Sequence, residues 1–259
     1  IYKMKNSRCF FILKFTILFI LLFGNNINAS ANEGNINTII TPFSIIGKDE
    51  RSEVVNSEKK PYSSISFIYS LDSICTGTIV DDDKVLTAAH CVYNPDTKQF
   101  YRNSTIYPGV NKDEFPFESA DSIEYIVPEP YIHSGNSKFD YAIIKLDKPI
   151  GQNIEKLDIK NIKYTKGKPI KVIGYPVDKL EETGTVSQYE MNGRVLSEDL
   201  FNLYYDIDTT SGQSGSPILN SKNEIIGIHI GSYRTNGLNG GIKVNKVMKN
   251  FINKNLEEK

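Results

Sequence analysis

The sequence predicts an all-β protein, built as a sandwich or as barrels and not around a parallel sheet. Short apolar or alternating runs, each a candidate strand, recur from residue 65 onward and are separated by turn residues. Glycine and proline are spread evenly, and tyrosine and phenylalanine are plentiful, as suits a β protein rich in turns. A helical pattern stands out only at the C-terminus.

The candidate strands follow one another at short intervals. They lie at residues 65–69, 75–80, 85–87, 123–127, 141–146, 170–173, 184–191, 203–208, 217–219 and 225–230. Turns are predicted at residues 81–84 (DDDK), at residues 221–223 (SKN) and at Asn192-Gly193, a pair typical of tight hairpins. Residues 151–168 are the expected link between two halves of the fold.

The C-terminal segment has the spacing of an amphipathic helix. Its apolar residues fall at i, i+3, i+4, i+7 and i+8, with lysine and asparagine between them. These residues are Val244, Val247, Met248, Phe251 and Ile252. The pattern predicts a helix that packs this stripe against the core.

Composition limits the possible functions. The chain has 259 residues, enough for one large or two small domains, and a net charge of −1, so no basic excess indicates nucleic acid. Its few cysteines and scattered histidines lack the spacing of metal ligands. We therefore expect no metal, no cofactor and no nucleic-acid partner.

The first 31 residues have the pattern of a secretory signal peptide. Basic residues precede an apolar run at residues 15–23, and the small residues ASA follow at 29–31. The apolar run is too short to span a bilayer comfortably. The sequence thus predicts a secreted, extracellular protein, free of the membrane once the signal is removed. The Asn-rich stretch at residues 32–43 is the expected propeptide.

Removal of the signal peptide also removes Cys9. Two cysteines remain, Cys75 and Cys91, an even number in an exported chain. The simplest interpretation is a disulfide between them.

Three polar residues stand beside apolar strands, in the order His, Asp, Ser. Ser214 lies between two glycines in a polar loop, where it could present a hydroxyl and nearby backbone N–H groups to one carbonyl. His90 follows an apolar strand, and Asp140 directly precedes another. Singly, they could be a turn serine, a structural histidine and a strand cap. Together they supply the nucleophile, the base and the orienting acid of acyl transfer, in an order that argues against an α/β-hydrolase.

Three segments carry a resemblance to a known family. TAAHC at residues 87–91, FDYAII at 139–144 and SGQSGSP at 211–217 resemble the triad segments of chymotrypsin-fold serine proteases. More narrowly, the chain resembles bacterial glutamyl endopeptidases. Further matching segments are SIIGKDER at 44–51, IGYP at 173–176, SQYEM at 187–191 and GIH at 227–229. The likeness runs from about residue 44 to the end of the sequence.

The resemblance implies a fold and a role for each candidate residue. It implies two antiparallel six-stranded barrels, at residues 44–155 and 156–259, with a C-terminal helix and the triad in the cleft between the barrels. Ser214 would be the nucleophile, His90 the base and Asp140 its orienting acid. Backbone N–H groups of Gly212 and Ser214 would form the oxyanion hole. We expect a monomer that acts on protein or peptide substrates.

The cleavage specificity has two interpretations. In the resembled family, residues matching His229 and Thr209 line the specificity pocket, where a cation or polarised N–H and a hydroxyl suit a glutamate, less readily an aspartate. Asp208 lies six residues before Ser214, where trypsin-like enzymes carry the acid that selects Lys or Arg. A third alternative is a catalytically silent barrel protein that binds a partner. His133 is expected to be an exposed residue without a role.

Activation is expected to differ from that of trypsin-like enzymes. Those enzymes carry an aspartate just before the nucleophile, which captures the new N-terminal amine; here Gln213 occupies that position. The new amine must therefore bind elsewhere, and the resemblance implies a place near the specificity pocket. We expect processing before Ser44.

Overall fold

The computed structural model describes residues 40–41, 45–163, 165–233 and 237–257. The predicted signal peptide and most of the predicted propeptide lie outside the described residues. No helix in the described ranges is long and apolar enough to cross a membrane.

Six antiparallel strands close the first barrel, in the order β10-β5-β4-β3-β8-β9. They are β3 (Ile65–Tyr69), β4 (Ile74–Ile79), β5 (Lys84–Thr87), β8 (Thr105–Pro108), β9 (Ala120–Ile126) and β10 (Ala142–Leu146). Their inward side chains form a dry core, since Ile65, Ile79 and Ile144 are fully buried. A hairpin of β6 (Tyr93–Asn94) and β7 (Gln99–Phe100) stands apart from the barrel.

The second barrel follows the order β15-β14-β11-β12-β13-β16 and closes through pairing of β15 with β16. Its strands are β11 (Pro169–Gly174), β12 (Tyr189–Glu198), β13 (Asn202–Tyr205), β14 (Pro217–Asn220), β15 (Ile225–Tyr233) and β16 (Leu238–Lys243). Two short strands extend this sheet: β1 (Ile40–Thr41) pairs with β15, and β2 (Ser52–Glu53) pairs with β12. The fold is therefore the expected pair of six-stranded antiparallel barrels.

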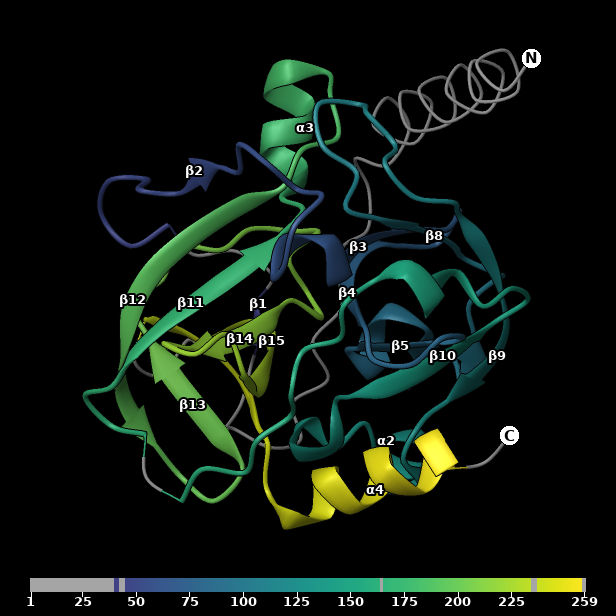
Figure 1. Ribbon diagram of the computed structural model, residues 1–259. Helices are drawn as coiled ribbons and strands as arrows, with labels where there is room; N and C mark the ends of the chain where they lie inside the picture. The colour runs from purple at the N-terminus through teal and green to yellow at the C-terminus, as the bar shows by residue number, and fades with distance from the viewer. Residues whose placement is uncertain (1–39, 42–44, 164, 234–236, 258–259) are drawn as a thin grey trace. The chain divides into compact units, whose positions relative to one another are not determined.

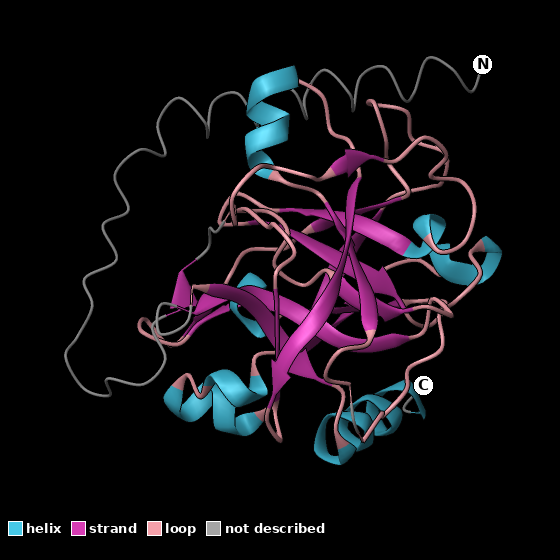
Figure 2. Cartoon of the chain, turned by 90° about the vertical axis from the view of Figure 1, so that its left-hand side faces the viewer, coloured by secondary structure: helices cyan, strands magenta, loops and turns pink. Residues whose placement is uncertain are grey.

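The barrels lie side by side, with helices outside the strands (Figures 1 and 2). The helices are α2 (Glu129–Ser134), α3 (Val177–Thr183) and α4 (Lys246–Glu257), and single 3-10 turns are η1 (Tyr62–Ser64), η2 (Ala89–Cys91), η3 (Ser137–Phe139) and η4 (Ile150–Asn153). Gln188 of the second barrel donates from Nε2 to the carbonyl oxygen of Ile65 in β3, at 3.2 Å. The same amide nitrogen donates to the hydroxyl of Tyr175, at 2.7 Å. Buried polar contacts of this kind join the two barrels.

The predicted C-terminal helix is confirmed, although its apolar stripe is only partly buried. Met248 and Ile252 are buried, whereas Val247 is 51% exposed, so its predicted place in the core was wrong. The ring of Phe251 lies 5.3 Å from that of Tyr141, at the start of β10. Helix α4 follows the second barrel in sequence and covers part of the first (Figure 1).

Two predictions about β12 were wrong. Residues 184–188 are not strand, because Gly184 ends α3 with a φ of +68°. Asn192-Gly193 is not a hairpin turn but lies within β12, where Gly193 pairs with Ile170. A Cβ on Gly193 would lie 2.5 Å from a side-chain carbon of Ile207, so close packing within the barrel, and not a turn, requires this glycine.

Candidate active site

His90 and Asp140 are brought together by the pairing of two strands. His90 lies in η2, which follows β5, and Asp140 immediately follows η3 and precedes β10. Since β5 and β10 pair with Ala142 opposite Thr87, the two side chains meet at one end of the first barrel. Nδ1 of His90 lies 2.7 Å from Oδ2 of Asp140, and the backbone N–H of His90 donates to Oδ1 at 2.9 Å.

The carboxylate sets the protonation of the imidazole. The N–H at Nδ1 of His90 donates a hydrogen bond to Asp140. In the neutral imidazole, Nε2 is therefore unprotonated and can accept a proton. Burial alone would lower the pKa of His90, but the charge of Asp140 and its hydrogen bond outweigh burial and raise that pKa above its usual value. One third of the His90 side chain remains exposed, against 6% for Asp140. The arrangement is that of an accessible base backed by a buried acid.

The structure contains the disulfide between Cys75 and Cys91 that the cysteine count predicts. It joins β4 to η2 across a sequence separation of 16 residues. Cys91 adjoins His90, so the cross-link restrains the backbone turn that carries the imidazole.

The Ser214 loop requires two glycines with positive φ. Gly212 and Gly215 have φ of +88° and +84°. A Cβ on Gly212 would lie 2.3 Å from the carbonyl oxygen of Tyr175, and one on Gly215 would lie 2.1 Å from that of Thr76. No other residue type fits either position without displacing the neighbouring backbone.

Thr76 of β4 holds the carbonyl side of this loop. Its backbone N–H donates to the carbonyl oxygen of Ser214, and its hydroxyl donates to that of Gly212, both at 2.8 Å. A Cβ on Gly215 would also lie 3.0 Å from the backbone nitrogen of Ala88, two residues before His90. The loop is thereby packed against the segment that carries the base.

The opposite side of the loop presents two free donors. Among the residues that the structure describes, the backbone N–H groups of Gly212 and Ser214 have no hydrogen-bond acceptor. The N–H groups of Gln213, Gly215 and Ser216 are all bonded, to carbonyl oxygens within the protein. The two unpaired N–H groups, one on each side of Gln213, can therefore donate hydrogen bonds to a negatively charged oxygen of a ligand.

Thr209 and His229 are both buried in the second barrel. The Thr209 hydroxyl has no hydrogen-bond partner within the described part of the chain. Nδ1 of His229 lies 2.7 Å from the hydroxyl of Tyr205, and burial raises the pKa of that phenol well above its usual value. The phenol therefore donates to Nδ1, and the neutral imidazole carries its proton on Nε2.

The surroundings of His229 favour a neutral imidazole. Burial, with the charge of His90 as a second cause, lowers its pKa to about 3, and a backbone hydrogen bond with Gly240 acts in the opposite direction. Of the two alternatives raised by the sequence, burial favours the polarised N–H over the imidazolium.

Asp208 is fully buried and already bonded. Its Oδ1 accepts the backbone N–H of Ile46 at 2.6 Å, and its Oδ2 accepts that of Glu50 at 3.1 Å. The carboxylate thus anchors the segment that precedes β2. Its position in the sequence, six residues before Ser214, gives no sign of this partner.

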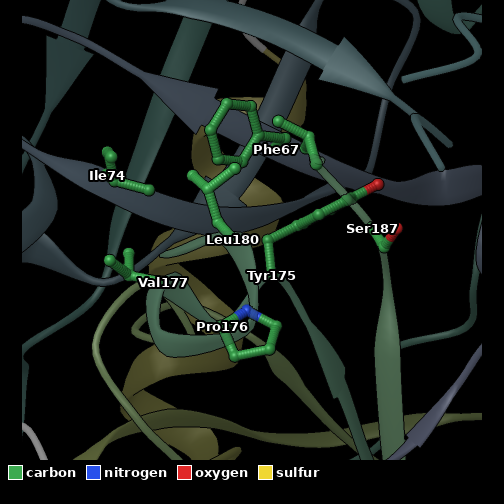
Figure 3. A pocket seen from close by; sticks show the side chains of 8 residues that line it. Phe67, Ile74, Tyr175, Pro176, Val177, Leu180 and Ser187 are labelled. Carbon is green, nitrogen blue, oxygen red and sulfur yellow. The ribbon is translucent and has the colours of Figure 1, made fainter. Parts of the chain in front are cut away.

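Other features of the surroundings are apolar or exposed. A shallow depression, without room for a water molecule, is lined chiefly by apolar side chains that include Ile74, Val177 and Leu180 (Figure 3). His133 is an exposed residue of α2, 3.6 Å from Glu129. No three His, Cys, Asp or Glu residues within the described ranges gather as metal ligands would.

Sequence comparison places the chain among known proteins. Residues 53–252 match the Trypsin family. A glutamyl endopeptidase of Bacillus licheniformis is 33% identical over 210 residues, a match that covers 78% of this chain and 64% of that relative. A glutamyl endopeptidase of Staphylococcus epidermidis is 31% identical over 228 residues, covering 84% of this chain and 76% of the relative.

Solved structures agree with this relationship. A Glu endopeptidase in complex with MPD matches with a TM-score of 0.81 and 40% identity, covering 83% of this chain and 100% of that chain. The protease Anisep of Arthrobacter nicotinovorans matches with a TM-score of 0.64 at 17% identity, covering 79% of this chain and 98% of that one. At that lower identity the likeness shows the fold alone.

Proposed function

The chain belongs to the trypsin family, and we propose that it is a secreted serine endopeptidase that hydrolyses peptide bonds after glutamate, less readily after aspartate. The observation that carries the proposal is the accessible His90–Asp140 pair together with the two unpaired N–H groups around Ser214. Base and oxyanion donors are the parts that acyl transfer needs besides the nucleophile.

The reaction proceeds through an acyl-enzyme. Ser214 Oγ bonds to the scissile carbonyl carbon, and its proton passes to Nε2 of His90. The carbonyl oxygen becomes an oxyanion that accepts the N–H groups of Gly212 and Ser214. The carbon–nitrogen bond then breaks, and His90 returns the proton to the leaving amine. Water, deprotonated by the same imidazole, releases the acid product and restores the Ser214 hydroxyl.

The substrate glutamate would meet Thr209 and His229. A buried hydroxyl without a partner is costly, so a ligand that bonds it is favoured. A neutral imidazole with its proton on Nε2 would supply a second donor to the same carboxylate, in place of its hydrogen bond with the backbone of Gly240. The two residues select the charged side chain by hydrogen bonding, without a formal positive charge from His229.

Cleavage after Lys or Arg through Asp208 is disfavoured. That carboxylate accepts two backbone N–H groups and is fully buried, so a substrate cation would have to displace the segment at residues 46–50. The silent-barrel alternative leaves the unpaired donors and the acid–base pair without a purpose.

The same anchor supports the proposed processing before Ser44. The N–H of Ile46 is bound to Asp208, and a chain cleaved before Ser44 begins two residues earlier. We propose that the signal peptide spans residues 1–31, that the propeptide spans 32–43, and that the mature protein acts as a monomer on proteins or peptides. N-terminal sequencing of the secreted protein tests the site; a fully active chain that begins at Asn32 contradicts it.

Peptides that differ only in the residue before the cleaved bond test the function. With Glu, Asp, Lys and Leu at that position, we expect kcat/KM to be highest for Glu and lower for Asp. The Ser214→Ala variant should lose about six orders of magnitude in kcat and all labelling by a fluorophosphonate probe. A preference for Lys rejects the glutamate pocket, and a wild-type chain that neither cleaves nor labels rejects the enzyme.

A further inference from the structure

Arg51 is a buried cation that the proposed reaction does not use directly. Its side chain is 1% exposed, and it lies just before β2, at the end of the segment that Asp208 anchors. A buried guanidinium is costly unless every donor finds a partner. Its partners therefore show what the residue does.

The guanidinium joins three separate segments of the chain. Its Nη1 donates to the Thr210 hydroxyl at 2.8 Å and to Oε1 of Gln213 at 3.1 Å, both in the Ser214 loop. Its Nη2 donates to Asp49 at 2.9 Å and also to Asp178 of α3. The two carboxylates supply the counter-charge, and the contact with Arg51 holds the pKa of Asp49 well below its usual range.

Gln213 transmits this anchor to the loop. It is 1% exposed, and its Oε1 also accepts the backbone N–H of Thr210 at 3.0 Å. Its own backbone N–H donates to the carbonyl oxygen of Thr210 at 3.1 Å. Gln213 lies between Gly212 and Ser214, so its orientation determines where their unpaired N–H groups point.

We propose that Arg51 is the positioning residue that holds residues 210–214 with the Gly212 and Ser214 N–H groups directed at the developing oxyanion. The inference rests on the proposed function. In trypsin-like enzymes an aspartate before the nucleophile binds the new N-terminal amine. Here the uncharged Gln213 occupies that position, and its Oε1 accepts a hydrogen bond from the guanidinium of Arg51. Thr76 holds the carbonyl side of the loop, and Arg51 holds its other end through Gln213 and Thr210.

The Arg51→Gln variant tests this role against a merely structural one. We expect kcat/KM to fall about 100-fold, the scale of losing one oxyanion donor. The affinity for a peptide aldehyde, whose adduct places an oxygen among the same donors, should fall by a similar factor. The affinity for a peptide that ends in a glutamate α-amide, whose neutral carbonyl brings no charged oxygen to these donors, should stay within about threefold, because the pocket residues are unchanged. Arg194→Gln is the matched control, since Arg194 is an exposed arginine of β12 whose Nη1, within the described part of the chain, donates only to a backbone carbonyl oxygen, that of Gly167.

A second variant, Gln213→Met, tests the same contact if the Arg51→Gln variant does not fold. Gln213→Met removes the acceptor at nearly constant size and should show the same split between aldehyde and amide affinity. In the double variant the losses should not multiply, since both changes break one contact. Gln213→Glu keeps an acceptor opposite Arg51 and should retain activity within about tenfold.

The outcomes separate the two proposals. A wild-type chain without turnover rejects the proposed function. A wild-type chain with turnover, together with an Arg51→Gln variant within threefold of it, rejects only the role of Arg51. Equal losses in aldehyde and amide affinity, or losses that multiply in the double variant, also overturn that role. If Arg51→Gln does not fold, normal aldehyde affinity in Gln213→Met overturns it.

Discussion

The base–acid pair and the Ser214 loop are held in place by different parts of the molecule. His90 and Asp140 lie at the ends of β5 and β10, which pair directly within the first barrel. The disulfide between Cys75 and Cys91 adds a cross-link inside the same barrel. The strand pairing, the acid and the cross-link that position the imidazole all belong to the barrel that carries it.

The Ser214 loop belongs to the second barrel, which bonds it at Ser211 and Gly215, but it is also held from outside that barrel. Thr76 comes from β4 of the first barrel, and Arg51 comes from the segment that precedes both barrels. The comparison teaches that changes near His90 should act locally, whereas the geometry of the loop depends on contacts made across the whole fold.

The largest effect should come from the acid of the self-contained half. In Asp140→Asn the amide can no longer fix the imidazole tautomer, and we expect kcat to fall about 10⁴-fold. Turnover needs neutral His90, so activity is lost as pH falls through the His90 pKa, which the Asp140 charge raises. Without that charge the acid limb of the kcat/KM profile should move to lower pH.

The control for this variant is Asp158→Asn, which changes a carboxylate that is 75% exposed. It should leave both the rate and the acid limb unchanged. An acid limb that stays in place in Asp140→Asn would show that another group titrates, and would break the assignment of the base.

The next effect should fall on stability and spare catalysis. Replacing Cys75 and Cys91 by alanine opens a loop whose ends are 16 residues apart, worth about 3 kcal/mol of unfolding free energy. The β5–β10 pairing still places Asp140 beside His90. We therefore expect the activation free energy to rise by no more than about 1 kcal/mol, so kcat should change less than about tenfold. Denaturant unfolding and kinetics on the same sample measure both. A large loss of kcat in folded protein would show that the first half is not self-contained.

Much of the fold could be predicted from local sequence, and the exceptions have physical causes. Runs such as β3 and β15 are apolar enough to mark strands by themselves. Strand β16 was missed because it contains Gly240 and Gly241, which have low strand propensity. Their use is tertiary: a Cβ on Gly241 would lie 2.1 Å from the carbonyl oxygen of Ile228 on the neighbouring strand.

The candidate site divides in the same way. His90, Asp140 and Ser214 could be singled out because each sits beside an apolar strand in a distinctive local sequence. Arg51 could not, because its partner Gln213 is 162 residues away. The partner of Asp208, the backbone N–H of Ile46, is equally distant, so position alone suggested a cation pocket where the structure has an anchor.

A smaller effect should follow from loosening the contact between the halves. Thr76→Val removes the hydroxyl that donates to the carbonyl oxygen of Gly212 and accepts the backbone N–H of Tyr175, at 2.8 and 3.0 Å. Both groups stay buried, so we expect a loss of about 2 kcal/mol in unfolding free energy. Released on its carbonyl side, Gly212 should also direct its N–H less well, lowering kcat/KM about tenfold, which is less than the roughly 100-fold cost of losing an oxyanion donor altogether.

Thr78→Val is the matched control for this variant, because Thr78 is buried on the same strand. In the described residues its hydroxyl makes no side-chain hydrogen bond, so stability and kcat/KM should stay near those of the wild type. If Thr76→Val loses stability but keeps its kcat/KM, the contact with β4 supports the fold without shaping the oxyanion donors. Of the two contacts from outside the second barrel, only that of Arg51 would then orient the donors. If both quantities fall together, the first barrel supplies the base and also holds the loop that carries the nucleophile.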